Sequence, residues 1–180
     1  MEIDPMRSDA LPIHIAAAAL LGMLSPLAVA AQSTSDKTLT VARIVGTWQL
    51  VSDEFTLKDG SVVSNPKFGA HAKGFQMYEP DGHMCAEMMN PDRPAWKNPQ
   101  KPTSDNKITS FDGFLGYCGT YALDAQHSIL THFPSVAWRP DYVGTSQSRP
   151  FHFEGEYLII TPVSNDPTIA KQVLTWKRVQ

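Results

Sequence analysis

Short β-type segments separated by turn residues are the feature of this sequence that most limits its fold. Segments rich in β-branched and aromatic residues recur along the chain, and Gly, Pro, Asn and Asp stand between them. Asp59-Gly60 is a hairpin signal, because glycine accepts the positive φ of a tight turn. The sequence predicts an antiparallel all-β domain, a barrel or a sandwich. The expected strands are residues 46–52, 61–63, 74–78, 83–89, 114–123, 129–133, 143–153, 157–161 and 172–179.

The first thirty residues differ from the rest of the chain. Residues 11–24 are almost continuously apolar, Arg7 precedes them, and Ala28-Val29-Ala30 follows. This pattern is typical of a secretory signal peptide with a small-residue cleavage site. The alternative is a membrane anchor, which needs about 20 apolar residues. We expect residues 1–30 to be removed, residues 31–40 to be a flexible lead-in and residues 41–180 to form one domain, which is periplasmic or secreted and free of the membrane.

Composition and charge restrict the partners. The formal net charge is −3, and no Lys/Arg cluster interleaved with aromatics occurs, which excludes nucleic acid as a partner. Cys85 and Cys118 lack the paired spacing of zinc ligands. In an oxidising compartment they either form a disulfide or remain two buried thiols, and the sequence leaves both open. The sequence does not determine the oligomeric state.

The segment from Asn90 to Lys107 contains four prolines, at positions 91, 94, 99 and 102. Proline removes a backbone donor and clashes with a preceding helical turn, so we expect neither regular helix nor central strand there. The segment is predicted to be a long surface loop. Such loops in compact domains are usually functional or disordered, and we expect this one to cover an opening.

The two ends of the domain bear on the choice between barrel and sandwich. Trp48 lies in the first predicted strand and Arg178 in the last. If the sheet closes on itself, these strands are neighbours, and the Arg178 guanidinium can lie over the Trp48 ring and plug one end. Otherwise Trp48 is an ordinary core residue and Arg178 is solvated.

Several motifs carry a resemblance to a known family. Gly46-Thr47-Trp48 with an arginine in the terminal strand resembles the calycin signature of lipocalins and fatty-acid-binding proteins. Further motifs resemble the bacterial and fungal lipocalin-like domain family, over about residues 42 to 179: Gly74-Phe75-x-Met77-Tyr78-x-Pro80-Asp81-Gly82, Phe111-Asp112-Gly113-Phe114-Leu115-Gly116-Tyr117 and Leu174-x-Trp176-x-Arg178. The resemblance implies an antiparallel up-and-down lipocalin-like β-barrel of about eight to ten strands. Members of the family look like carriers or cofactor-free enzymes of small-molecule metabolism.

A barrel of about eight strands has room inside for side chains or for one small ligand. We expect the interior to hold aromatic rings with a polar tip and one cation, because such groups can enclose and orient a ligand. The alternative is that the tyrosines are core rings and that the histidine and arginine lie at the surface. The predicted interior residues are Tyr78, Tyr117, Tyr121, His132 and Arg149.

Three of these residues are also candidates for catalysis. His132 is suited to proton transfer near neutral pH, Arg149 to stabilising a carboxylate or enolate, and Tyr117 shares their predicted interior. Met77 and Met88 are predicted to line the pocket, because the flexible, polarizable methionine side chain adapts to the shape of a ligand. Glu87 is flanked by apolar strand residues, and the sequence leaves open whether it points inward as a base or outward into solvent.

The chain contains no Gly-x-Ser-x-Gly elbow, phosphate-binding glycine loop, His-Glu-x-x-His or dinucleotide fingerprint, and we predict no cofactor or metal. The predicted function is therefore the binding of a small, mostly apolar metabolite inside the barrel. The alternative is a cofactor-independent cyclase, isomerase or dehydratase that uses the same pocket, because positioning and one acid or base can suffice for such reactions.

Overall fold

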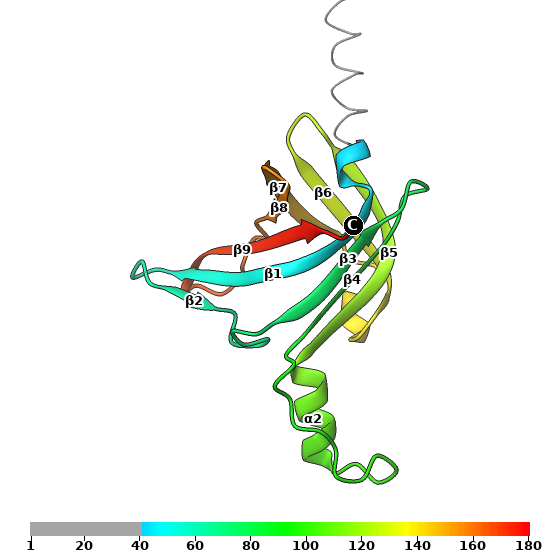
Figure 1. Cartoon of the computed structure of the whole chain (residues 1–180), viewed down its shortest axis with the longest axis vertical. Coiled ribbons are helices and arrows are strands. Elements are labelled where there is room, and N and C mark those ends of the chain that lie inside the picture. Colours follow the sequence, from blue (N-terminus) through cyan, green and yellow to red (C-terminus); the bar gives the residue numbers. More distant parts are fainter. Residues whose placement is uncertain (1–40) are drawn as a thin grey trace, which may run out of the picture.

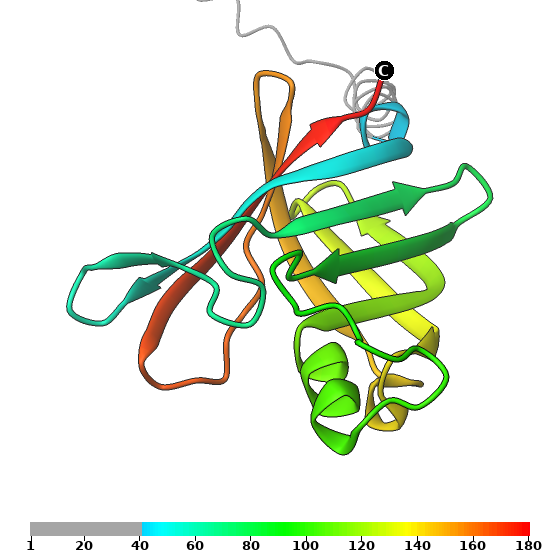
Figure 2. The same cartoon turned by 60° about the horizontal axis from the view of Figure 1, so that its bottom comes forward.

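The computed structural model describes residues 41–180, so the predicted signal peptide and lead-in lie outside the described residues. The described chain forms one nine-stranded antiparallel sheet (Figures 1 and 2). Its strands are β1 (Gly46–Leu57), β2 (Val62–Ser64), β3 (Lys73–Tyr78), β4 (His83–Met89), β5 (Phe114–Asp124), β6 (Ile129–Ala137), β7 (Gln147–Glu154), β8 (Tyr157–Ile160) and β9 (Ile169–Arg178). A short 3-10 helix, η1 (Pro140–Tyr142), precedes β7.

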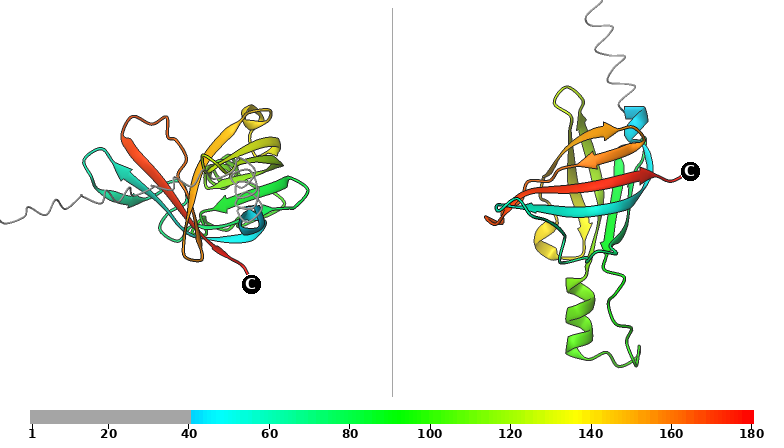
Figure 3. Two further views of the ribbon diagram at one scale, coloured as in Figure 1. Left: turned by 90° about the horizontal axis from the view of Figure 1, so that it is seen from above. Right: turned by 60° about the vertical axis from the view of Figure 1, so that its left-hand side comes forward.

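The sheet closes into a barrel because its first and last long strands pair. The strand order is β2-β1-β3-β4-β5-β6-β7-β8-β9, with an additional pairing between β1 and β9. In Figure 3 (right) β1 and β9 run side by side across the front of the barrel. Eight strands form the closed barrel. The ninth, β2, forms a hairpin with β1 by pairing with its residues Glu54 to Thr56. The predicted up-and-down barrel is confirmed, and the sandwich alternative is excluded.

One end of the barrel is plugged by packed side chains, and we call it the packed end. The Arg178 guanidinium carbon lies 4.4 Å from the centroid of the Trp48 ring, as expected for a closed sheet. Its nitrogens donate to the backbone carbonyls of Val45, at 2.6 Å, and Arg43. The Trp48 indole N–H donates to the carbonyl of Ile44 at 2.9 Å. The polar atoms of this plug therefore have partners within the protein.

The connection between β4 and β5 differs from its prediction. Residues 104–112 form helix α2 (Ser104–Asp112), whereas a loop was expected to continue to Lys107. The last proline is Pro102, and Thr103 begins the helix as a capping box: its hydroxyl accepts from the Asn106 N–H and the Asn106 side chain accepts from the Thr103 N–H. Prolines before the cap do not prevent a helix after it.

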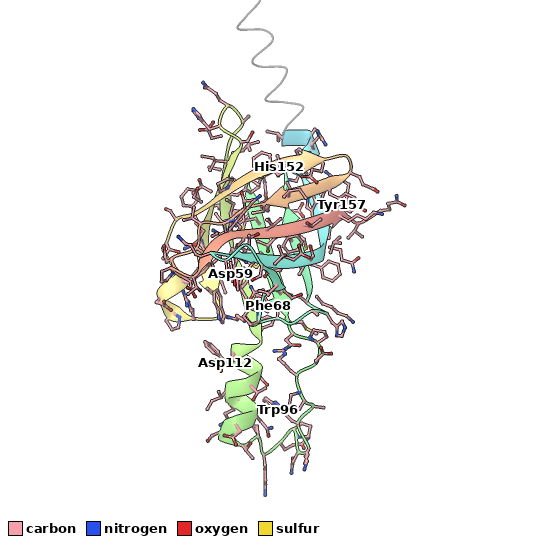
Figure 4. The ribbon with its side chains drawn as sticks, turned by 90° about the vertical axis from the view of Figure 1, so that its left-hand side faces the viewer. Asp59, Phe68, Trp96, Asp112, His152 and Tyr157 are labelled. Atoms are coloured by element: carbon pink, nitrogen blue, oxygen red, sulfur yellow. A yellow bond between two sulfur atoms is a disulfide. The ribbon has the colours of Figure 1, made fainter. Side chains whose placement is uncertain are left out.

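Residues 90–113, which we call the arm, project away from the barrel (Figure 1). Figure 4 shows Trp96 and Asp112 on the arm, with Phe68 nearer the barrel. The loop is tied to the helix because the Trp96 indole donates to the Ser110 hydroxyl at 2.9 Å and Arg93 donates to the Ser110 carbonyl at 2.7 Å. No residue of α2 is buried. Among residues 41–180, no helix is long and apolar enough to cross a membrane.

The two cysteines occupy facing positions on adjacent strands. Cys85 of β4 pairs with Cys118 of β5, with their Cα atoms 4.1 Å apart, and the two form a disulfide. Of the two alternatives that the sequence left open, the structure has the disulfide. Cys85 lies four residues before the end of β4, and Cys118 lies four residues after the start of β5.

Candidate ligand-binding site

A cavity of about 240 Å³ lies inside the barrel, in the half from which the arm projects. We call this half the cavity end. Its walls are mainly apolar and include Phe55, Phe68, Met88, Leu174 and Trp176. At the density of liquid water this volume corresponds to about eight water molecules, so it suits a ligand of roughly ten non-hydrogen atoms.

A β-bulge in β1 turns an acidic residue into this cavity. The register of β1 against β9 shifts between Leu50 and Ser52. Before the shift Trp48 and Leu50 face the interior, and after it Asp53 faces the interior, which strict alternation would have pointed outward. Val51 is 54% exposed, whereas Asp53 is only 3% exposed. Bulges re-aim side chains in this way and are frequent beside active sites.

Two amide side chains hold the Asp53 carboxyl. The Asn65 amide donates to Oδ2 at 2.7 Å, and the Gln172 amide, from β9, donates to Oδ1 at 2.8 Å. Burial raises the pKa of Asp53, and the two hydrogen bonds partly oppose that rise. Within residues 41–180, no Lys, Arg or His nitrogen lies within 4.0 Å of this carboxyl. The acid is held in place by neutral donors and not by a cation.

On the other side of the barrel, a histidine bridges two tyrosines. The His132 Nε2 lies 2.8 Å from the Tyr78 hydroxyl, and its Nδ1 lies 2.8 Å from the Tyr117 hydroxyl. The Gln76 amide donates to the Tyr78 hydroxyl. Tyr117 and Gln76 both line the cavity, so the chain of hydrogen bonds begins and ends at the cavity wall and passes through the buried His132 and Tyr78. We call these four residues the relay.

Burial keeps the relay neutral. His132 is 1% exposed, and burial followed by the positive charge of Arg149 lowers its pKa to about 3. Burial raises the pKa of Tyr117 to about 12, although Arg149 acts in the opposite direction, and raises the pKa of Tyr78 well above its ordinary value. At neutral pH the imidazole is therefore uncharged, and both phenols keep their protons.

Matching each hydrogen-bond donor of the relay with an acceptor determines which group donates in each of its hydrogen bonds. Because the Tyr78 hydroxyl accepts from the Gln76 amide, we assign its own proton to the hydrogen bond with His132 Nε2. A neutral imidazole has one donor and one acceptor, so Nδ1 then carries the proton and donates to the Tyr117 oxygen. This assignment pairs each acceptor with a donor. It leaves the Tyr117 hydroxyl proton free to point into the cavity.

Arg149 supplies positive charge beside the relay. It lines the cavity from β7, and its guanidinium donates to the Tyr142 hydroxyl at 2.9 Å and to the Ser148 carbonyl at 2.9 Å. Lys67 also lines the cavity, and burial followed by repulsion from Arg139 lowers its pKa. Neither cation is within 4.0 Å of a carboxylate in the part of the chain described. The cavity wall thus carries two cationic side chains and one carboxyl.

The family model described as a lipocalin-like domain matches residues 45–179, which include every strand of the barrel. The chain belongs to the lipocalin-like domain family. Comparison with curated proteins finds no match.

In this lipocalin-like domain the predicted site residues fall into two groups. The structure brings Tyr78, Tyr117, His132 and Arg149 together, and Met88 lines the cavity. The candidate acid or base His132 lies behind Tyr117 and does not line the cavity itself.

Three predicted ligand contacts lie elsewhere in the lipocalin-like domain. Met77 lies beside the disulfide on the outer face of β3, because its neighbours Gln76 and Tyr78 point inward. Glu87 is exposed between the inward-facing Ala86 and Met88, so the outward alternative holds for it.

Tyr121 packs its ring against Tyr78, at 4.9 Å between centroids, and donates its hydroxyl to the Glu79 carbonyl at 3.0 Å. It lies near the packed end, away from the residues that line the cavity.

Sequence reasoning missed Asp53 and Trp176. Asp53 was missed because the alternation that starts at Trp48 places it outside, and nothing in the local sequence marks the bulge. The alternation does show that Trp176 shares a strand face with Leu174. It does not show whether the indole N–H has a hydrogen-bond partner, because that depends on neighbouring strands. The Trp176 indole nitrogen is buried and has no hydrogen-bond partner within residues 41–180. No group of three His, Cys, Asp or Glu side chains in those residues is arranged to hold a metal ion.

Proposed function

We propose that this lipocalin-like protein binds a small, mostly apolar molecule inside its barrel. The observation that carries the proposal is the 240 Å³ cavity, with apolar walls and a few polar groups set into them. Such a combination is typical of ligand sites, where apolar contact supplies affinity and a few polar groups supply orientation. The volume limits the ligand to a molecule smaller than a common drug.

The apolar walls also set the expected affinity. Removing apolar surface from water stabilises the bound state by about 25 cal/mol per Å². Part of this gain is offset by the loss of translational and rotational freedom. For a ligand of about ten non-hydrogen atoms we expect dissociation constants of micromolar order.

A cavity-filling variant tests the proposal. Ala86 is buried and lines the cavity, so Ala86→Phe places a ring in the space that a ligand needs. Ala122→Phe adds the same ring on an exposed position of β5 and is the matched control. Indole and toluene are titrated into each protein, and the chemical shifts of the Trp176 indole N–H and the Met88 methyl are followed by NMR.

We expect saturable binding by the wild type and by Ala122→Phe, and none by Ala86→Phe. If Ala86→Phe binds these probes as well as the wild type does, the ligand does not occupy the cavity. If the wild type binds neither probe, the proposed function is wrong.

We further propose that the protein acts after export, in the periplasm or outside the cell. Two observations support this: the signal-like composition of residues 1–30 and the Cys85–Cys118 disulfide. Disulfides persist in oxidising compartments and are rare in the cytosol. Expression of the full chain in a bacterium, followed by fractionation and mass measurement, tests this proposal. A cytosolic protein with an intact N-terminus and two free thiols would contradict it.

A second candidate function is cofactor-independent catalysis. The observation in its favour is Tyr117, which lines the cavity and whose hydroxyl lies 2.8 Å from His132 Nδ1. In this case Tyr117 is the group that contacts the substrate, while His132 holds its orientation and Arg149 supplies positive charge. Tyr117→Phe that leaves turnover of a candidate substrate unchanged would remove this role.

A further inference from the structure

The cavity has polar groups of opposite character on opposite walls. Asp53 lies on β1 and is held by Gln172 of β9, whereas Tyr117 lies on β5. In the closed eight-strand ring, β5 stands three strands from β1 in one direction and five in the other. A ligand that fills the cavity therefore meets the carboxyl on one side and the phenol on the other.

Asp53 can accept further hydrogen bonds. A carboxylate offers about four lone-pair positions, and the amides of Asn65 and Gln172 use two of them. The absence of a cation within 4.0 Å, among the residues described, leaves the carboxyl without charge compensation. A buried acceptor of this kind gains most from a ligand group that donates a hydrogen bond.

Tyr117 has the opposite capacity. In the relay, as assigned above, its oxygen accepts a hydrogen bond from the His132 Nδ1–H, and its own hydroxyl proton is left for the cavity. Arg149, on the same side, adds positive charge. This wall is suited to a ligand oxygen that accepts a hydrogen bond and carries partial negative charge.

Resting on the proposed function, we propose that the ligand is a small molecule with a hydroxyl group at one end, bound by Asp53, and a carbonyl oxygen at the other, bound by Tyr117. The two cations of the wall, Arg149 and Lys67, disfavour a cationic amine in the same space. The apolar residues between the two walls suit an aromatic or aliphatic middle section.

Three matched probes separate the two ends of the ligand. Para-hydroxyacetophenone carries both groups, para-methylacetophenone lacks the hydroxyl, and para-ethylphenol lacks the carbonyl. Binding is measured by calorimetry and by the Trp176 indole N–H signal. We expect the wild type to bind the first probe about tenfold more tightly than either of the others, since a hydrogen bond to a buried group contributes about that factor. This comparison needs no variant.

Two variants then assign each end. In Asp53→Asn, para-hydroxyacetophenone should bind at most twofold more tightly than para-methylacetophenone, which lacks the hydroxyl. Its tighter binding relative to para-ethylphenol, which lacks the carbonyl, should remain. In Tyr117→Phe, para-hydroxyacetophenone and para-ethylphenol should bind with equal affinity. The tighter binding of para-hydroxyacetophenone relative to para-methylacetophenone should remain. Asp59→Asn and Tyr157→Phe make the same chemical changes outside the cavity and should retain both preferences; Figure 4 labels both positions.

The outcomes distinguish this inference from the proposed function. If the wild type binds all three probes with equal affinity and Ala86→Phe abolishes binding, the cavity is a ligand site but the proposed polarity is wrong. If the preferences are present but are unchanged in both Asp53→Asn and Tyr117→Phe, the assignment to these residues is wrong. Binding of none of the three probes overturns the proposed function and this inference together.

Discussion

The packed end and the cavity end of this barrel share the same strands but use their polar groups differently. At the packed end, Arg178 and the Trp48 indole are hydrogen-bonded within the protein. At the cavity end, the Trp176 indole N–H has no partner within residues 41–180, and Asp53 has lone pairs to spare. The first arrangement stabilises the fold, because buried groups are satisfied. The second leaves hydrogen-bonding capacity unused, and the proposed ligand site depends on that capacity.

The largest expected effect concerns pH and the relay, whose buried His132 lies behind the cavity wall. The pKa of His132 is about 3 in the folded protein, against an ordinary value of 6.5. As the pH falls below 6.5, His132 is protonated in the unfolded chain but remains neutral in the folded protein. The free energy of unfolding therefore decreases as the pH falls, and the decrease is complete near pH 3. It amounts to about 5 kcal/mol in total. Urea unfolding at a series of pH values measures it.

His132→Gln should have a flatter dependence of unfolding free energy on pH between 6.5 and 3 than the wild type. His152→Gln changes an exposed histidine and should keep the wild-type dependence. An unchanged slope in His132→Gln would mean that the imidazole is not held neutral in the folded protein.

The next largest effect tests the plug of the packed end. Trp48→Ala removes a buried ring that contacts Phe153 and Arg178, and we expect it to lower the unfolding free energy by about 4 kcal/mol. Chemical denaturation measures this. The dissociation constants of indole and toluene should change by less than about twofold, because Trp48 does not line the cavity. A large change in both stability and binding would break the comparison between the two ends.

Met88→Ala is the corresponding change at the cavity end. Met88 is buried but faces open space on one side, so we expect a loss of about 2 kcal/mol, at the low end for a buried methionine. The enlarged cavity should shift preference toward larger ligands, such as naphthalene over toluene. Denaturation and titration together measure both effects. A loss as large as that of Trp48→Ala would show that this end is packed as tightly as the other.

The smallest expected effect concerns the cation over the plug. Arg178→Met keeps much of the side-chain length but removes the contact with Trp48 and the hydrogen bonds to backbone carbonyls. We expect a loss of about 1 kcal/mol in thermal or chemical unfolding. Lys177→Met, one residue earlier, alters an exposed ion pair and should cost less. The reverse order would argue against Arg178 as part of the plug.

The sequence predicted the barrel better than it predicted the site. Alternating strands and turn residues are local signals, and they placed most strands within a few residues of their observed bounds. The contact of Arg178 with Trp48 was one of two alternatives that the sequence left open, and the structure has it. Helix α2 was missed because its capping box pairs Thr103 with Asn106 and not with the more usual glutamate or glutamine, and because four prolines precede it.

The cavity was harder to predict because it depends on the whole barrel. The inward position of Asp53 results from a register shift against β9, a strand more than one hundred residues away along the chain. The relay was partly anticipated, since Tyr78, Tyr117 and His132 were expected inside. Their order, with His132 behind Tyr117, depends on cross-strand geometry that alternation does not specify.

The disulfide has a consequence for how this protein tolerates cleavage. Cys85 and Cys118 are 33 residues apart in sequence, and the arm lies entirely between them. A protease that cuts the arm would therefore leave two fragments joined by a covalent bond, with the barrel strands still in register. The nicked protein would migrate as one species until a reductant separated its halves.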